Sequence, residues 1–107
     1  MKLLIICQLA VTSKNMVTKV TKLAQELDYE MEVQCAPVAY VRDLEFSKFD
    51  VVLVAPQARN YMRDILEKCE PLQIPVESID VVAYGLADAK KILDQAKKVL
   101  EKGGENK

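Results

Sequence analysis

The chain has 107 residues, of which 50% are hydrophobic and 29% charged, and its formal net charge is −1. These values predict one soluble globular domain with a core of its own, exclude a disordered chain, and argue against nucleic acid as the main partner. Because the chain has no histidine, a Ser-His-Asp or Cys-His catalytic couple, a histidine metal ligand and a histidine phosphocarrier are also excluded.

The N-terminal half predicts two strands separated by one long helix. Consecutive apolar residues in Lys2–Ile6 are typical of a strand covered on both faces. A polar loop leads to a helix over about Ser13–Leu27, and the alternating residues Met31–Cys35 predict a half-exposed strand at a sheet edge. Pro37 then breaks the chain, and Val41–Phe46 could form a short helix. The inward face of the long helix is expected to comprise Met16, Val20, Leu23, Ala24 and Leu27.

The C-terminal half repeats this alternation. Asp50–Ala55 is again continuously apolar and predicts a second central strand, which Pro56 ends. A helix follows over Asn60–Cys69, then a fourth strand of mixed polarity over Pro75–Asp80, and a turn at Gly85. A final helix is expected from about Ala87 to Glu101, with Ile92, Ala96, Val99 and Leu100 facing inward. Residues 1–101 would then form the domain and Lys102–Lys107 a flexible tail.

Alternating strands and helices predict an α/β fold with a parallel sheet, right-handed crossovers and helices on both faces. The two continuously apolar strands belong in the centre, and the other two at the edges, which gives the order 2-1-3-4 in a three-layer sandwich. In such a sheet the ligand site lies at the carboxyl ends of the strands where the order reverses. Cys7 and the segment Pro56–Asn60 both fall at that point.

The three cysteines carry different expectations. They include no Cys-x-x-Cys pair, so neither zinc nor thioredoxin-like redox chemistry is indicated. An odd number without a signal peptide fits a reducing cytosol, and no stretch approaches the ~20 apolar residues of a membrane span. Cys35 and Cys69 are interpreted as core residues, because each continues an apolar face.

Cys7 directly follows the first predicted strand and is the candidate residue for chemistry. Six residues separate it from Lys14, where the helix is expected to begin. The positive end of the helix dipole and the unpaired backbone N–H groups there favour a thiolate and can also wrap a phosphoryl group. Thr12 and Ser13 add hydroxyl donors, and Lys14 could add a cation. The indicated chemistry is attack by sulfur on phosphorus, which gives a phosphocysteine.

Plainer interpretations of the same residues stay open. Cys7 could be a small buried hydrophobic residue at a strand end. Thr12 and Ser13 could only cap the helix, and Lys14 could simply be solvated.

Other doubly wound folds fit the residues less well. A low-molecular-weight tyrosine phosphatase needs an arginine six positions after the cysteine, and this chain has Ser13 there. A response-regulator receiver needs an acidic pair after the first strand and an aspartate after the third, where this chain reads ICQL and VAPQ. A flavodoxin phosphate loop is rich in Ser, Thr and Gly, and Gln8–Thr12 has no glycine.

Three segments, in order and at the right spacing, resemble the IIB component of the lactose/cellobiose class of the bacterial phosphoenolpyruvate:sugar phosphotransferase system. The first is Cys7–Lys14, CQLAVTSK, where the family has Cys-Ser-Ala-Gly-Met-Ser-Thr-Ser. The second is Val51–Gln57 followed by Tyr61-Met62, similar to the family's VVLLGPQ and a Tyr-Met pair. The third is Ile74–Asp80, IPVESID, followed by Tyr84-Gly85.

The resemblance implies that Cys7 accepts a phosphoryl group from a phosphohistidine of a IIA partner and donates it to a sugar bound by the membrane IIC permease. The sugar would be a β-glucoside or disaccharide such as cellobiose or lactose. The phosphate cradle would be the loop of Gln8, Leu9, Ala10, Val11, Thr12, Ser13 and Lys14, with Gln57 and Tyr61 near it on a possible partner surface. No cofactor or metal is implied, and the protein would be cytoplasmic and associate with the permease.

Two departures from the family pattern keep a second hypothesis open. Ala10 and Ala55 replace glycines of the family, and Gln8 and Leu9 are bulkier than its Ser and Ala. Glycine lets a backbone approach phosphate without strain. The alternative is therefore a IIB-like regulatory or binding module that no longer transfers phosphate.

Overall fold

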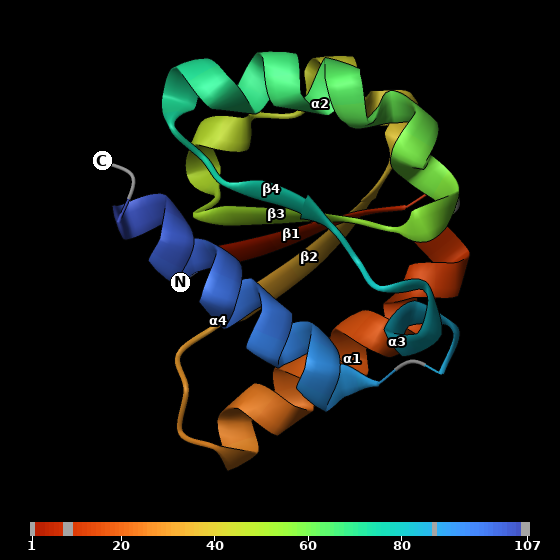
Figure 1. Cartoon of the computed structure of the whole chain (residues 1–107). Coiled ribbons are helices and arrows are strands. Elements are labelled where there is room, and N and C mark those ends of the chain that lie inside the picture. The colour runs from red at the N-terminus through yellow and green to blue at the C-terminus, as the bar shows by residue number, and fades with distance from the viewer. Residues whose placement is uncertain (1, 8–9, 87, 106–107) are drawn as a thin grey trace.

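The computed structural model describes residues 2–7, 10–86 and 88–105, without the side chains of residues 10–14, 41 and 102–105. Its centre is a four-stranded sheet of β1 (Lys2–Cys7), β2 (Glu32–Pro37), β3 (Val51–Val54) and β4 (Val76–Ser78). All pairings in this sheet are parallel, and the order is β2-β1-β3-β4 (Figure 1). The predicted α/β fold class and strand order are confirmed.

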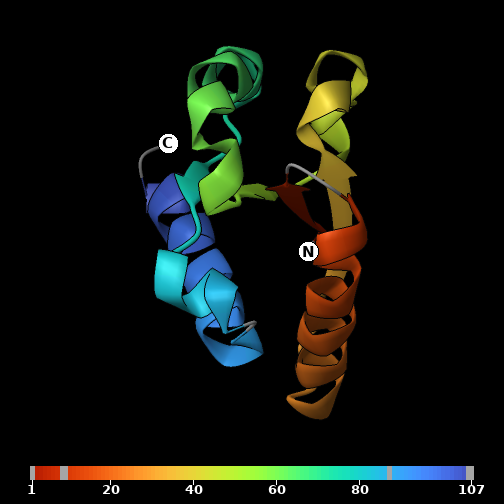
Figure 2. The ribbon, with the colours of Figure 1, turned by 90° about the vertical axis from the view of Figure 1, so that its right-hand side faces the viewer.

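Helices cover both faces of the sheet, which gives three layers (Figure 2). One face carries α1 (Ala10–Glu26) and α4 (Ala89–Glu105), with the short α3 (Val81–Gly85) beside α4. The other face carries α2 (Met62–Cys69) and four 3₁₀ helices. These are η1 (Val38–Asp43), η2 (Phe46–Lys48), η3 (Pro56–Tyr61) and η4 (Glu70–Leu72).

Two apolar cores lie above and below the sheet. Side chains alternate between the faces of a strand, so Leu3 and Ile5 of β1 join the core under α1 and α4, whereas Leu4 and Ile6 join the core under α2. The four residues of β3 are completely buried in the same alternating way. Continuous apolarity therefore marked the two central strands because both of their faces are covered.

The edge strand β2 also follows its predicted pattern. Met31, just before it, and Val33 are buried, while Glu32 and Gln34 are exposed. The strand continues beyond the predicted Cys35 to Pro37, which pairs with Cys7 at the end of β1. Proline is tolerated there because an edge strand can lack one ladder donor at its end.

Several predicted helix boundaries were wrong. Helix α1 begins at Ala10 and not near Ser13, and Leu27, expected to face inward, is 55% exposed just beyond the helix end. The chain turns there through Asp28, whose φ is 55°. Val41–Phe46 is not one helix, because η1 ends at Asp43 and η2 begins at Phe46.

The C-terminal elements also differ from their predictions. Helix α3 was not predicted, and α2 begins at Met62 because η3 occupies the preceding residues. Helix α4 continues to Glu105, so Lys102–Glu105 extend the helix, and the last two residues lie outside the described residues. The division into a domain and a flexible tail stays a prediction.

Candidate functional site

The carboxyl edge of the sheet brings together the end of β1, the start of α1 and the start of η3. Cys7 is the last residue of β1, and α1 begins three positions later, at Ala10. Segment Ala55–Ala58 follows β3, the strand next to β1, and the Ala55 N–H donates to the Ile6 carbonyl at 2.7 Å. These are the elements that the strand order predicted to meet at the switch point.

The Cys7 side chain is completely buried in this structure. Alternation along β1 places it on the face that α1 covers. Its thiol donates to the backbone carbonyl of Ala36 in β2, with Sγ and O 3.7 Å apart. The thiol is thus held between the sheet and the helix that begins beside it.

The helices that start at this edge differ in how their N-termini are capped. Asp80 accepts from the Ala83 N–H of α3 at 3.0 Å, and Asp88 accepts from the Lys91 N–H of α4 at 3.1 Å. No side chain caps η3. The residue before α1 is Leu9, whose side chain has no acceptor atom. The first N–H groups of a helix lack helical partners, so the α1 terminus beside Cys7 keeps a positive potential that no aspartate of its own offsets.

The predicted cradle Gln8–Lys14 divides into two parts. Gln8 and Leu9 lie outside the described residues, and Ala10–Lys14 form the beginning of α1 and not a loop before it. The helix can start this early because no glycine or proline interrupts the segment. The described part of the predicted cradle therefore offers the first-turn N–H groups of α1.

The two alanines at glycine positions of the family are not strained. Ala55 has φ −62° and ψ 150°, an extended conformation open to any residue. Ala10 is the first residue of α1, where helical φ values are negative. Neither position needs the positive φ that glycine supplies.

Gln57 is the second residue of η3 and Tyr61 the last, beyond the carboxyl end of β3. Gln57 is exposed and Tyr61 is 45% exposed, so Tyr61 is not the core residue that the helical pattern with Ile65 and Cys69 indicated. Tyr61 instead lines an open hollow of about 330 Å³ between η1 and α2. The other residues lining it are Val38, Ala39, Arg42, Asp64, Glu67 and Lys68.

The other two cysteines belong to the cores, as the sequence indicated. Cys35 is half-buried against the core under α1 and α4, and Cys69 is completely buried under α2. Burial raises the pKa of the Cys69 thiol from 9.0 to about 11. None of the three cysteines is disulfide-bonded.

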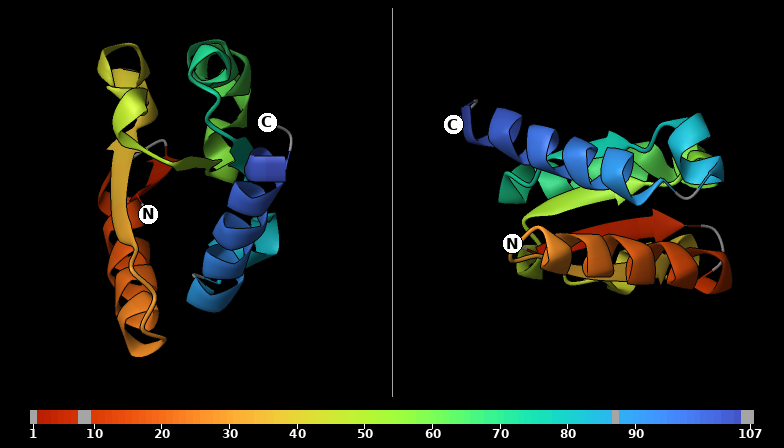
Figure 3. Two further views of the ribbon diagram at one scale, coloured as in Figure 1. Left: turned by 90° about the vertical axis from the view of Figure 1, so that its left-hand side faces the viewer. Right: turned by 90° about the horizontal axis from the view of Figure 1, so that it is seen from below.

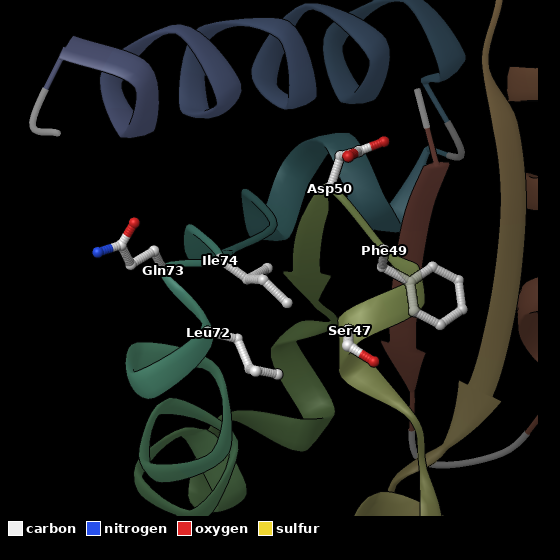
Figure 4. A pocket seen from close by; sticks show the side chains of 6 residues that line it. All are labelled: Ser47, Phe49, Asp50, Leu72, Gln73 and Ile74. Carbon is white, nitrogen blue, oxygen red and sulfur yellow. The ribbon is translucent and has the colours of Figure 1, made fainter.

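A second hollow, of about 200 Å³, lies at the opposite, amino edge of the sheet (Figure 4). Its lining includes Asp50, Leu72 and Gln73. The Asp50 carboxylate accepts from the Lys2 N–H at 2.7 Å, so it fastens the start of β1 to the start of β3. The Asp50 carboxylate therefore has a structural role at the amino edge, and Cys7 lies at the opposite end of β1.

Sequence reasoning missed α3 and its exposed side chains. The signal that could have found it is the N-cap pattern of an aspartate before a short apolar run, present at Asp80. In the part of the chain that the structure describes, no group of three or more His, Cys, Asp and Glu side chains could hold a metal ion. No helix among those residues has the length and apolarity to cross a bilayer.

Comparison with known proteins places this geometry among characterised folds. The family described as PTS system, lactose/cellobiose specific IIB subunit, matches residues 2–95. The oligo-beta-mannoside-specific EIIB component of the PTS system of Bacillus subtilis (strain 168) is 32% identical over 95 residues, which are 89% of this chain and 91% of that protein.

Two solved structures share the fold. The lactose-specific IIB component domain of Streptococcus pneumoniae aligns with a TM-score of 0.75 and 22% identity, over 94% of this chain and 95% of that one. The cellobiose-specific phosphotransferase IIB component of Borrelia burgdorferi aligns with a TM-score of 0.77 and 25% identity, over 96% and 94%.

Proposed function

The chain belongs to the lactose/cellobiose-specific IIB subunits of the phosphotransferase system, a class of phosphotransferases, and we propose that Cys7 is its phosphoryl carrier. Cys7 takes a phosphoryl group from a phosphohistidine on a IIA protein and gives it to a sugar bound by a membrane IIC permease. The position of Cys7 at the end of a central strand, three positions before the start of α1, carries this proposal.

The transfer is a displacement at phosphorus. The Cys7 sulfur forms the S–P bond while the P–N bond to the donor imidazole breaks, and the thiol proton ends on the imidazole nitrogen that leaves. The phosphoryl oxygens carry negative charge throughout. First-turn N–H groups of α1 can donate to them, with the helix dipole adding a favourable potential.

Burial of Cys7 sets a condition on this reaction. A sulfur atom that carries a phosphoryl group has no proton to donate, so the bond to the Ala36 carbonyl is lost on phosphorylation. The side chain then turns from Ala36 towards the α1 terminus, which exposes the phosphoryl group to the next acceptor. The structure described above corresponds to the resting thiol.

The partners follow from the same chemistry. With no histidine in this chain, the donor imidazole comes from the IIA protein. The sugar is held by the permease, and the protein works at the cytoplasmic side of the membrane beside it. The names of the relatives favour a β-linked disaccharide or oligosaccharide. Gln57 and Tyr61, exposed at this edge, lie within the surface that partners approach.

The alternative is a IIB-like module that has lost transfer. It is motivated by Ala10, Leu9 and Ala55. Leu9 lies outside the described residues, and the two alanines have ordinary backbone conformations. The observation that still favours it is the complete burial of Cys7.

The test is incubation with phosphoenolpyruvate, the general phosphotransferase components and a IIA protein, followed by mass spectrometry under mildly alkaline conditions. We expect one added phosphoryl group, mapped to Cys7. Cys35→Ser is the matched control, because Cys35 lies on the neighbouring strand and should leave the modification unchanged. An unmodified wild-type chain with every donor tested favours the non-transferring module.

A further inference from the structure

Helix α3 presents an apolar face to solvent at the same end of the molecule as Cys7. Val81, Val82 and Leu86 are 60%, 58% and 70% exposed. Seen down the helix axis, these three residues and Gly85 cover about 140° of the circumference of α3, because successive residues of an α-helix are 100° apart. A Cβ at Gly85 would meet open space, so nothing in the described chain covers this face.

Helix α3 is anchored to the core on the side opposite this face. Ala83, on the opposite side of α3, is 2% exposed and packs into the core under α1 and α4 with Tyr84 beside it. Asp80 caps the start of α3, and the Leu86 N–H donates to the Val82 carbonyl at 3.0 Å at its end. A surface that needs no ordering on contact loses little entropy when it binds.

The strand that leads into α3 ends near Cys7 on the scale of a protein interface. Helix α3 follows the carboxyl end of β4, which is two strands from β1, or about 10 Å at ordinary strand spacing. A standard interface buries about 800 Å² on each partner, which is a disc of about 16 Å radius. Figures 1 and 3 show α3 and the start of α1 at the same end of the molecule.

We propose that the α3 face, defined by Val81, Val82, Gly85 and Leu86, is the docking surface for the phosphohistidine-bearing donor protein. This inference rests on the proposed function, because a donor that brings its imidazole to Cys7 covers this edge of the sheet. A protein buries such side chains in the centre of an interface. A membrane surface is disfavoured, because the segment is bounded by Asp80 and Asp88 and has no basic residue between them.

The experiment compares lysine substitutions at both edges of the sheet. Val82→Lys and Leu86→Lys place a charge on the α3 face. Leu72→Lys does the same at the amino edge, where Leu72 is 46% exposed beside the hollow of Figure 4. The measurements are KM and kcat for Cys7 phosphorylation by the purified phosphorylated donor, and Kd for the unphosphorylated donor by calorimetry.

We expect both α3 variants to raise KM and Kd at least about fivefold with little change in kcat, as loss of a central apolar contact does. Leu72→Lys should stay within about twofold of wild type. Circular dichroism checks folding, and Val82→Ser, which keeps a small side chain, should still weaken donor binding if a lysine variant does not fold.

Each other outcome has one meaning. If wild type is phosphorylated and the α3 variants keep its KM and Kd, the docking surface is wrong and the proposed function stands. If wild type is never phosphorylated, the proposed function fails and the inference with it. A concentration-dependent dimer that Val82→Lys dissociates, with donor affinity unchanged, would assign the face to a second copy of this chain.

Discussion

Cys7 and Cys69 are both completely buried, yet they lie at opposite edges of the sheet and at opposite ends of helices. Cys69 is the last residue of α2, where the Ile74 N–H donates to its carbonyl and burial raises its thiol pKa to about 11. Cys7 ends β1, three positions before the start of α1. Burial alone therefore does not distinguish the two thiols. Their positions relative to the helices do, because Cys7 precedes a helix start and Cys69 lies at a helix end.

The amino and carboxyl edges of the sheet also differ in how their carboxylates are used. At the amino edge the Asp50 carboxylate is used to join β1 to β3. At the carboxyl edge Asp80 and Asp88 cap α3 and α4, while the first turn of α1 holds no acidic residue. The proposed function uses this difference, because an anion is favoured at a helix start that holds no carboxylate.

Serine substitutions at Cys7 and Cys69 should have the largest and most different effects. Cys7→Ser removes the nucleophile, and we expect phosphoryl transfer to fall by at least about a thousandfold, because a hydroxyl is a far weaker nucleophile than a thiolate. Cys69→Ser should keep the rate and lose about 1–3 kcal/mol of folding stability, because it buries a hydroxyl. The measurements are transfer rate and urea unfolding. Transfer that persists in Cys7→Ser would refute the assignment.

Proline substitutions at the first residues of α1 and α4 test whether a backbone N–H of α1 binds the phosphoryl group. Ala10→Pro removes one N–H from α1 at the position where helices accept proline best. We expect transfer to slow roughly tenfold or more, as when one donor to a developing anion is lost.

Ala89→Pro is the matched control at the start of α4, which Asp88 already caps. Its transfer rate should equal that of wild type. Equal rates in Ala10→Pro and Ala89→Pro would show that the Ala10 N–H does not bind the phosphoryl group.

The raised pKa of Cys69 predicts a stability change in alkali. The folded pKa of about 11 exceeds the unfolded value of 9.0, so the unfolded chain loses this proton first. The contribution is complete below pH 9 and is lost as the pH rises from 9 to 11, by up to about 2–3 kcal/mol. Urea unfolding between pH 8 and 11 should show a smaller loss in Cys69→Ala than in wild type. Parallel curves for the two proteins would contradict the shift.

The smallest expected effect is that of removing the Asp88 cap of α4. Asp88→Ala leaves the Lys91 N–H at the start of α4 without its acceptor, and we expect a loss of about 1 kcal/mol of folding stability with an unchanged transfer rate. Thermal unfolding and the transfer assay check the two statements. A reduced transfer rate would show that the start of α4 also takes part in transfer, against the contrast drawn with α1.

The sequence allowed the strand order to be predicted because the central and edge strands have different patterns. Continuous apolar residues in β1 and β3 and alternation in β2 reflect how many faces each strand has covered. Helix starts were harder, since Ala10–Lys14 has ordinary helix-forming residues and no sharp start signal. The exposure of Tyr61 and the α3 face depended on how short 3₁₀ and α-helical segments pack, and no periodicity of a few residues reveals that.

The most direct test of the central claim is a ¹H–¹⁵N spectrum of the chain before and after phosphorylation by its donor, with the modified residue mapped by mass spectrometry. The account predicts one phosphoryl group on Cys7 and large amide shifts at the start of α1, from Ala10 to Ser13, with small shifts at the starts of α3 and α4. A phosphoryl group on another residue, or α1 amides that do not respond, would contradict it.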